Sequence, residues 1–210
     1  MVELGEVAAT RVALLELRDE RRLVQEGYEL LDEKRVLLAT AILRELRAYV
    51  AADQQLATLW RTARAALAAA VEIHGFDDLT VEPPLPLDQA LLRTSRHDFL
   101  GLPLRDAVLE APLAVPGAVR SAEPVRDTPE LRHCALAFRA VAVELVAQAA
   151  RATNLRQLVA EYRRTERRAR ALENVLLPEI DRSVAFIEEQ LDAVDQEEAV
   201  RVRNAGAARE

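Results

Sequence analysis

The sequence has little of what a thick globular core requires. Its 210 residues include only four phenylalanines, three tyrosines, one tryptophan and six glycines. Alanine, leucine, glutamate and arginine are abundant instead, a composition that favours long helices or coiled coils. Small side chains fill the narrow space between paired helices, whereas few large rings are present to fill a wide core. We therefore expect an all-α chain dominated by long helices.

The chain has one cysteine, Cys134, which excludes an internal disulfide and fits a reducing compartment. The first residues, Met1–Thr10, have neither the basic nor the apolar region of a signal peptide. The apolar stretch Ala65–Ile73 is too short to span a bilayer, and Ala135–Ala150 is interrupted by two charged residues. We expect a cytoplasmic protein without direct membrane insertion, which reaches a membrane only through other proteins.

No catalytic, cofactor-binding or metal site is predicted. The sequence contains no phosphate-binding loop, no zinc-protease motif, no nucleophile elbow and no dinucleotide fingerprint. The three histidines, His74, His97 and His133, have no cysteine or carboxylate partner at metal-ligand spacing. A formal net charge of -7 counts against a general nucleic-acid binder. We expect a protein that is not an enzyme and needs no cofactor.

The prolines divide the chain into three segments. Eight of the nine lie within residues 83–129, and the ninth is Pro178. Proline removes a helical hydrogen bond and clashes with the preceding turn. The sequence therefore predicts an N-terminal coiled-coil arm over residues 1–74, a middle segment over 75–128 and a C-terminal coiled-coil arm over 129–210.

Apolar residues recur at the seven-residue spacing of a coiled-coil seam in both arms. The seam positions are Leu17, Val24, Leu31 and Leu38 in the first arm and Leu155, Tyr162, Ala169, Leu176, Ile180 and Ile187 in the second. Arg21 and Arg35 also fall on the first seam. Leu23, Leu30 and Leu37 are expected to widen it. Each arm would be on the order of 100 Å long. We expect the two arms to pair antiparallel, because a lone helix of that length cannot cover its apolar stripe.

Two helix starts and two irregular positions stand out. Thr10 is a candidate cap of the first arm, and Thr128 followed by Pro129 is a start signal for the second. Gly27 lies inside a predicted helix, where it indicates either close approach of a partner helix or neighbouring subunit, or a tolerated small residue. Pro178 is expected to loosen or bend the second arm and to leave a carbonyl unpaired. Such a bend either has a mechanical role or is a kink without one.

The middle segment is predicted to contain a short β-hairpin. Gln89–Thr94 and Asp98–Leu104 are the candidate strands, with the polar run of residues 95–97 between them. Leu113–Arg126 is rich in proline, alanine and glycine and is expected to be a loop.

A basic cluster lies in the second arm, formed by Arg163, Arg164, Arg167 and Arg168. Nucleic-acid binding would also need aromatic residues for stacking, and the cluster has none suited to that. A solvated helix face is the common explanation for such a run.

Short motifs in both arms match a known family in order and spacing. In the second arm they are Thr153-Asn154-Leu155, Tyr162, Thr165, Arg167-Arg168, Ala171-Leu172-Glu173, Leu177-Pro178, Phe186-Ile187, Leu191-Asp192, Glu197-Glu198 and Arg201-Val202-Arg203. In the first arm they are Thr10-Arg11, Leu14-Leu15, Arg22-Leu23, Gly27, Leu30-Leu31 and Lys34-Arg35. With these motifs the chain resembles the D subunits of V-type and archaeal-type ATPases.

The resemblance implies a non-catalytic central stalk, or rotor shaft, that couples ATP hydrolysis or synthesis to ion translocation. The implied partners are the catalytic and non-catalytic subunits of the ATPase ring, a small F subunit of the stalk, and a funnel-shaped subunit that leads to the membrane rotor ring. The arginine cluster would then contact acidic loops of the ring. A generic antiparallel coiled-coil scaffold or adaptor is the alternative, since composition and periodicity fit it equally well.

Overall fold

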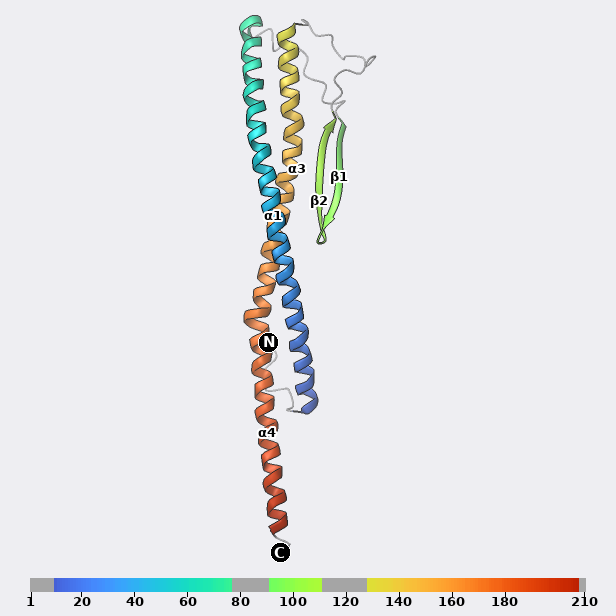
Figure 1. The fold of residues 1–210 in the computed structure, drawn as a ribbon, viewed down its shortest axis with the longest axis vertical. Coiled ribbons are helices and arrows are strands. Elements are labelled where there is room, and N and C mark those ends of the chain that lie inside the picture. The colour runs from blue at the N-terminus through green and yellow to red at the C-terminus, as the bar shows by residue number, and fades with distance from the viewer. Residues whose placement is uncertain (1–9, 77–90, 111–127, 208–210) are drawn as a thin grey trace. The chain divides into compact units, whose positions relative to one another are not determined.

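The computed structural model describes residues 10–76, 91–110 and 128–207 of the chain. Its elements in chain order are α1 (Arg11–His74), β1 (Leu91–Phe99), β2 (Leu102–Glu110), α3 (Pro129–Ala171), the π turn η2 (Leu172–Leu176) and α4 (Leu177–Ala207) (Figure 1). The predicted architecture is confirmed: two long helical arms with a small antiparallel hairpin between them in the sequence.

The helix starts lie where the sequence places them. The Thr10 hydroxyl accepts a hydrogen bond from the backbone N–H of Ala13 at 3.1 Å. The Thr128 hydroxyl likewise accepts one from the N–H of Leu131 at 3.5 Å. Each hydroxyl thus pairs an N–H group of a first turn that has no partner within its helix. After α1, Gly75 has a φ of 78°, the left-handed conformation with which glycine commonly ends a helix.

The hairpin turns at Leu100 and Gly101, so the predicted turn at residues 95–97 is wrong. Both turn residues have positive φ, 51° and 82° respectively, as a two-residue type I′ turn requires. The residues 95–97 instead lie within β1, where their side chains are exposed. A polar run is compatible with a strand that faces water, whereas Gly101 supplies a conformation that other residues rarely adopt.

The predicted strand limits are corrected with the turn. Leu91 pairs with Glu110 and Phe99 with Leu102, so both strands are longer than expected and β2 extends well past Leu104. The start of the first predicted strand, residues 89–90, and the predicted loop over 113–126 lie outside the described residues.

The chain forms two compact units. Unit 1 comprises residues 1–37 and 161–210, and unit 2 comprises residues 38–160; α1 and α3 contribute to both. In unit 2 the ring of Trp60 meets that of Phe138 edge-on, with centroids 6.0 Å apart. Gln148 of α3 donates a hydrogen bond to the backbone oxygen of Tyr49 in α1 at 3.1 Å. These contacts pair the two helices of unit 2 in antiparallel order.

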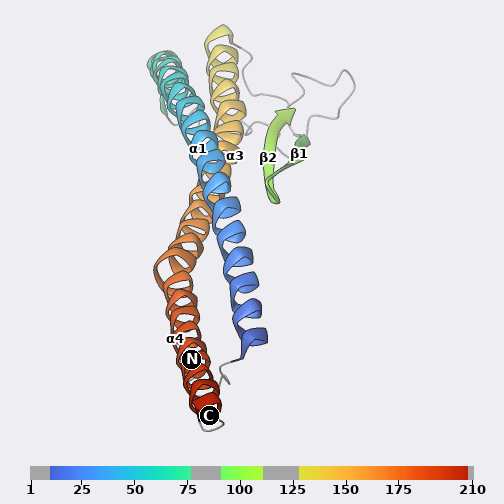
Figure 2. The same ribbon diagram turned by 60° about the horizontal axis from the view of Figure 1, so that its bottom comes forward.

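In unit 1, α1 and α4 also run in opposite directions (Figures 1 and 2). The apolar stripe on α1 is narrower than the sequence suggested, because Leu23, Leu30 and Leu37 are 68%, 66% and 51% exposed. Consecutive residues of an α-helix differ by about 100° in direction, so Leu37 points well away from the seam that its neighbour Leu38 occupies. The expectation that these three leucines widen the seam is therefore wrong.

Candidate functional site

None of the predicted seam residues is fully exposed. Leu38, Ala169, Ile180 and Ile187 are buried. The other predicted seam positions are half-buried: Leu17, Val24, Leu31, Leu155, Tyr162 and Leu176. Half-burial is expected of a seam between only two helices, since a pair of helices has no third element to close its sides.

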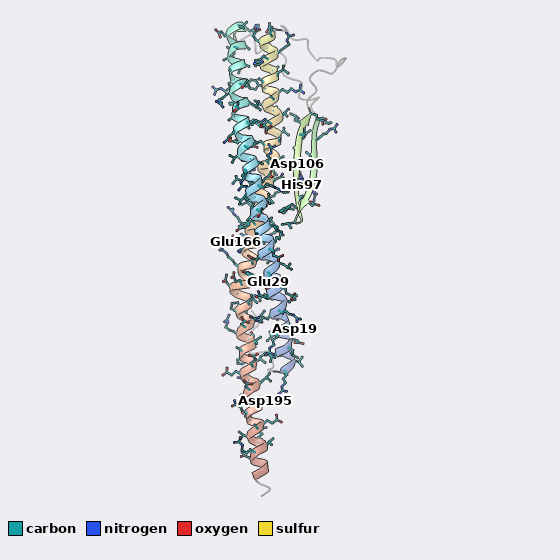
Figure 3. All side chains as sticks on the ribbon, in the orientation of Figure 1. Asp19, Glu29, His97, Asp106, Glu166 and Asp195 are labelled. Carbon is teal, nitrogen blue, oxygen red and sulfur yellow. The ribbon has the colours of Figure 1, made fainter. Side chains whose placement is uncertain are left out.

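Ion pairs cross between the helices at four levels in the described part of unit 1. They join Arg11 to Asp195 at 3.1 Å, Arg18 to Glu188 at 2.6 Å, Arg21 to Asp181 at 2.5 Å and Lys34 to Glu161 at 2.6 Å. Figure 3 labels Asp195, the acidic partner farthest along α4. In all four, α1 supplies the base and α3 or α4 the acid. The pair of Lys34 with Glu161 is part-buried, whereas the other three are exposed. Exposed pairs contribute about 0–1 kcal/mol each, so the main effect of these three is to favour the antiparallel order and its register.

The two arginines on the α1 seam are accommodated by nearby carboxylates. Arg21 reaches Asp181 across the helix pair, and this hydrogen bond raises the pKa of its guanidinium. Arg35 instead pairs with Asp32 of its own helix at 2.5 Å. Long basic side chains can cover apolar surface with their stems while the charged ends reach water. The seam therefore tolerates both residues.

The basic cluster lies on the outside of α3. Arg163, Arg164, Arg167 and Arg168 are all exposed. Thr165 and Ala169, on the same two turns, are buried. At about 100° per residue, Arg163 and Arg167 lie within about 40° of each other on the outer side of the helix. The structure thus presents positive charge outward on unit 1 at the predicted positions.

Gly27 faces the π turn. A Cβ atom added at Gly27 would lie 3.9 Å from Cδ1 of Leu172, which is ordinary van der Waals contact. The packing of α1 against η2 therefore does not itself require glycine. The adjacent Tyr28 lies near Glu173, whose negative charge raises the pKa of the Tyr28 phenol.

Pro178 lies in the first turn of α4, directly after the π turn. The backbone N–H of Leu177 bonds to the oxygen of Leu172, five residues earlier, so the helix widens here and continues. The sequence indicated a local loosening at this position but not its form.

The described residues contain no group of three or more histidine, cysteine or acidic side chains arranged to hold a metal ion. By length and composition alone, the helical stretch Pro129–Asn204 is apolar enough to cross a membrane. One such helix is weak evidence, because helices of water-soluble proteins pass the same test. Cys134 is part-buried, and desolvation raises the pKa of its thiol, which disfavours the reactive thiolate.

Comparison with known proteins identifies the family. The family model for the D subunit of ATP synthase matches residues 13–207. The chain belongs to the ATP synthase D-subunit family. It is 28% identical over 207 residues to the D subunit of a V-type ATP synthase from Thermus thermophilus, covering 95% of this chain and 87% of that protein. It is 30% identical over 201 residues to the D subunit of the V-type ATP synthase from Anaeromyxobacter dehalogenans, covering 95% of both chains.

This family assignment agrees with the resemblance found in the motifs, and it identifies the chain as a subunit of a V/A-type ATPase. One of those motifs contains Asn154, to which sequence reasoning gave no role. Its buried side-chain amide accepts a hydrogen bond from the N–H of Arg105 at 2.9 Å and donates one to the carbonyl of the same residue at 2.8 Å. Asn154 of α3 thus pairs with β2 as a neighbouring strand would.

The Asn154 amide protects a strand edge that would otherwise present unpaired backbone groups. The adjacent Leu104 is buried, and the two hydrogen bonds of the Asn154 amide join β2 to α3 beside it. The contact between Asn154 and Arg105 could not be predicted from the sequence, because the two residues are 49 positions apart and no local pattern links them. On the two strands, His97 and Asp106 lie 3.4 Å apart (Figure 3).

Replacing Asn154 by alanine is expected to release the hairpin in this family member. The change leaves the N–H and C=O of Arg105 without their partners, at a cost of about 1–3 kcal/mol. Hydrogen–deuterium exchange should therefore speed up at the Arg105 amide by about five-fold or more while α1 is unaffected. Thr153→Ala is the matched control, because the Thr153 side chain is exposed and its hydroxyl donates a hydrogen bond to the backbone oxygen of Ala149 in its own helix. Equal exchange at Arg105 in both variants would contradict the assigned role.

Proposed function

We propose that the chain is the non-catalytic central-stalk subunit of a V/A-type rotary ATPase. As a rotor shaft it couples ATP hydrolysis or synthesis in the ring of catalytic and non-catalytic subunits to ion translocation through the membrane rotor ring. The proposal also includes a small F subunit of the stalk and a funnel-shaped subunit as partners of the shaft. The family assignment supports membership of the complex, and the geometry of unit 1 supports the mechanical role.

The charge arrangement of unit 1 carries this proposal. Cross-helix ion pairs, such as Arg18 with Glu188, connect α1 to α4. The outer face of α3 meanwhile keeps Arg163 and Arg167 exposed. A shaft that turns inside a ring needs contacts that hold at several angles, since tight apolar packing would favour one angle only. Long, solvated arginine side chains facing acidic groups meet that requirement, because such contacts act over distance and are weakly directional.

In this proposal the shaft subunit couples the two processes without making or breaking a covalent bond itself. Each state of the ring favours a different angle of an asymmetric shaft, and the shaft angle in turn biases the state of the ring. A single chain folded back on itself is asymmetric at every level, because α1 supplies bases and α3–α4 supply acids to the ion pairs. The chain itself would reach the membrane only through its partners and lie on the cytoplasmic side.

A coiled-coil scaffold outside any rotary motor is the competing function, and native purification separates the two. The chain, tagged at its genomic locus, is isolated from its own cells, and co-purifying proteins are identified and quantified by mass spectrometry. We expect the two large ring subunits and a small F-like subunit to be recovered in stoichiometric amounts. Recovery of a different set of partners without ring subunits would refute the rotor proposal and favour the scaffold.

A further inference from the structure

The buried positions of α3 and α4 follow a seven-residue repeat, except at one place where the spacing is eight residues. Leu158 and Thr165 are 1% and 2% exposed, and Leu172, seven residues on, faces α1 at Gly27. Continuing the repeat would bury positions 179 and 186. The buried residues are instead Ile180 and Ile187, at 4% and 2% exposure, whereas Phe186 is 43% exposed. The helix therefore holds one residue more than its repeat requires between Leu172 and Ile180.

The π turn lies within the same interval. An α-turn closes a hydrogen bond between residues four apart, whereas the bond from Leu177 to Leu172 spans five. One residue more is therefore enclosed in this turn than in the turns around it. If the same residues formed a regular α-helix without the π turn, every side chain after it would point in a direction about 100° from the observed one. Ile180 and Ile187 would then face away from α1. The extra residue and the π turn compensate each other.

Pro178 explains why the wide turn lies at this position. It has no N–H to bond the carbonyl of Asn174, and in a regular α-helix its ring would clash with that carbonyl. In the π turn directly before the proline, the helix is wider than a regular α-helix. The proline thus makes the regular alternative unfavourable at this place, while the buried isoleucines further on require the wide turn to exist at all.

We propose that residues 172–178 are a phase-setting element, in which the π turn absorbs one residue in excess of the heptad repeat and Pro178 fixes its place. The element determines which side chains of α4 face α1 and which face outward. It is a property of this chain's own helix pair and stands independently of the rotor proposal.

The test uses the full-length chain in two deletion variants. The first lacks Val175, an exposed residue of the π turn, and carries Pro178→Ala. With the extra residue removed, Leu177 takes the seam position of Leu176, and Ile180 and Ile187 return to the uninterrupted repeat. The control lacks Glu29, an exposed residue of α1 at the level of the π turn. The seven-residue repeat of α1 contains no extra residue there.

Thermal unfolding followed by circular dichroism compares the two deletions. The Val175 deletion with Pro178→Ala should unfold within about 3 °C of the parent, whereas the Glu29 deletion should lose about 10 °C or more, because its seam leucines leave their sites. Equal losses in the two variants would overturn the proposal, since they would mean that no residue of the π turn is in excess.

Cross-linking measures the phase directly. Cysteines replace Arg21 and Asp181, which form an ion pair across the helices, in a Cys134→Ala background, and a short bis-maleimide joins them. The yield should be unchanged both in the Val175 deletion with Pro178→Ala and in Pro178→Ala alone, because in the latter the extra residue still demands a π turn. A several-fold loss of yield in Pro178→Ala alone would mean that the proline causes the turn and would overturn the proposal.

Discussion

Reversing the charge of Arg163 and Arg167 together is expected to reduce ATP-driven ion pumping by about ten-fold or more in the assembled ATPase. Placing like charges against each other at an interface costs several kcal/mol, and about 1.4 kcal/mol corresponds to a factor of ten. Both side chains are exposed, so Arg163→Glu with Arg167→Glu should change the stability of the chain by no more than about 0.5 kcal/mol each. Pumping is measured in membrane vesicles together with ATP hydrolysis.

The control reverses two exposed arginines on another helix, Arg44→Glu with Arg47→Glu. It makes the same change in net charge without touching the α3 cluster. Neutral replacements, Arg163→Gln with Arg167→Gln, should give a smaller loss, because they remove attraction without adding repulsion. Unchanged pumping in the doubly reversed enzyme would refute a ring contact at these arginines and leave a solvated helix face as their explanation.

The helical arms were predictable because their signals are local. A capping hydroxyl at Thr10, the pair Thr128 and Pro129, and apolar residues at seven-residue spacing each depend on neighbours within a turn or two. The family motifs could be recognised for the same reason, since they are short runs at fixed spacing. What the sequence could not supply was the width of the seam. Whether Leu37 packs or faces water depends on how many helices surround it.

The sequence predicts the hairpin turn at a polar run, whereas the structure forms it at a glycine, Gly101. Residues 95–97 are polar because β1 is exposed, whereas Gly101 supplies a positive φ that the turn needs. The contact between Asn154 and Arg105 depends on a pairing across the fold. No pattern within either segment predicts it.

The π turn is intermediate between the helical arms, which have local sequence signals, and the contact of Asn154 with Arg105, which has none. The sequence contains its signal, because the step from Leu172 to Ile180 is eight residues where the repeat allows seven. The neighbouring apolar residues Leu176 and Leu177 hide that step, since either leucine can be assigned to the seam. Burial of Ile180 and Ile187 removes the ambiguity.

Two adjacent leucines provide the sharpest test of the seam itself. Leu38 is 0% exposed and Leu37 is 51% exposed, although the sequence predicts both on the apolar stripe. Leu38→Ala is expected to lower the free energy of unfolding by about 2–5 kcal/mol, because it removes buried methyl groups and leaves a cavity. For a chain of this size that corresponds to a fall in Tm of roughly 5–20 °C. Thermal and urea unfolding followed by circular dichroism measure it.

Leu37→Ala is the matched control, with the same atoms removed from the next residue of the same helix. It should change stability by no more than about 0.5 kcal/mol, since alanine also has the higher helix propensity. Leu38→Met, which keeps the volume, should cost less than about 1.5 kcal/mol and guards against loss of folding in the alanine variant. Equal effects of Leu37→Ala and Leu38→Ala would place both residues at the interface. The helix pair would then have a seam two residues wide at this level, and the outward leucines of α1 would belong to its core.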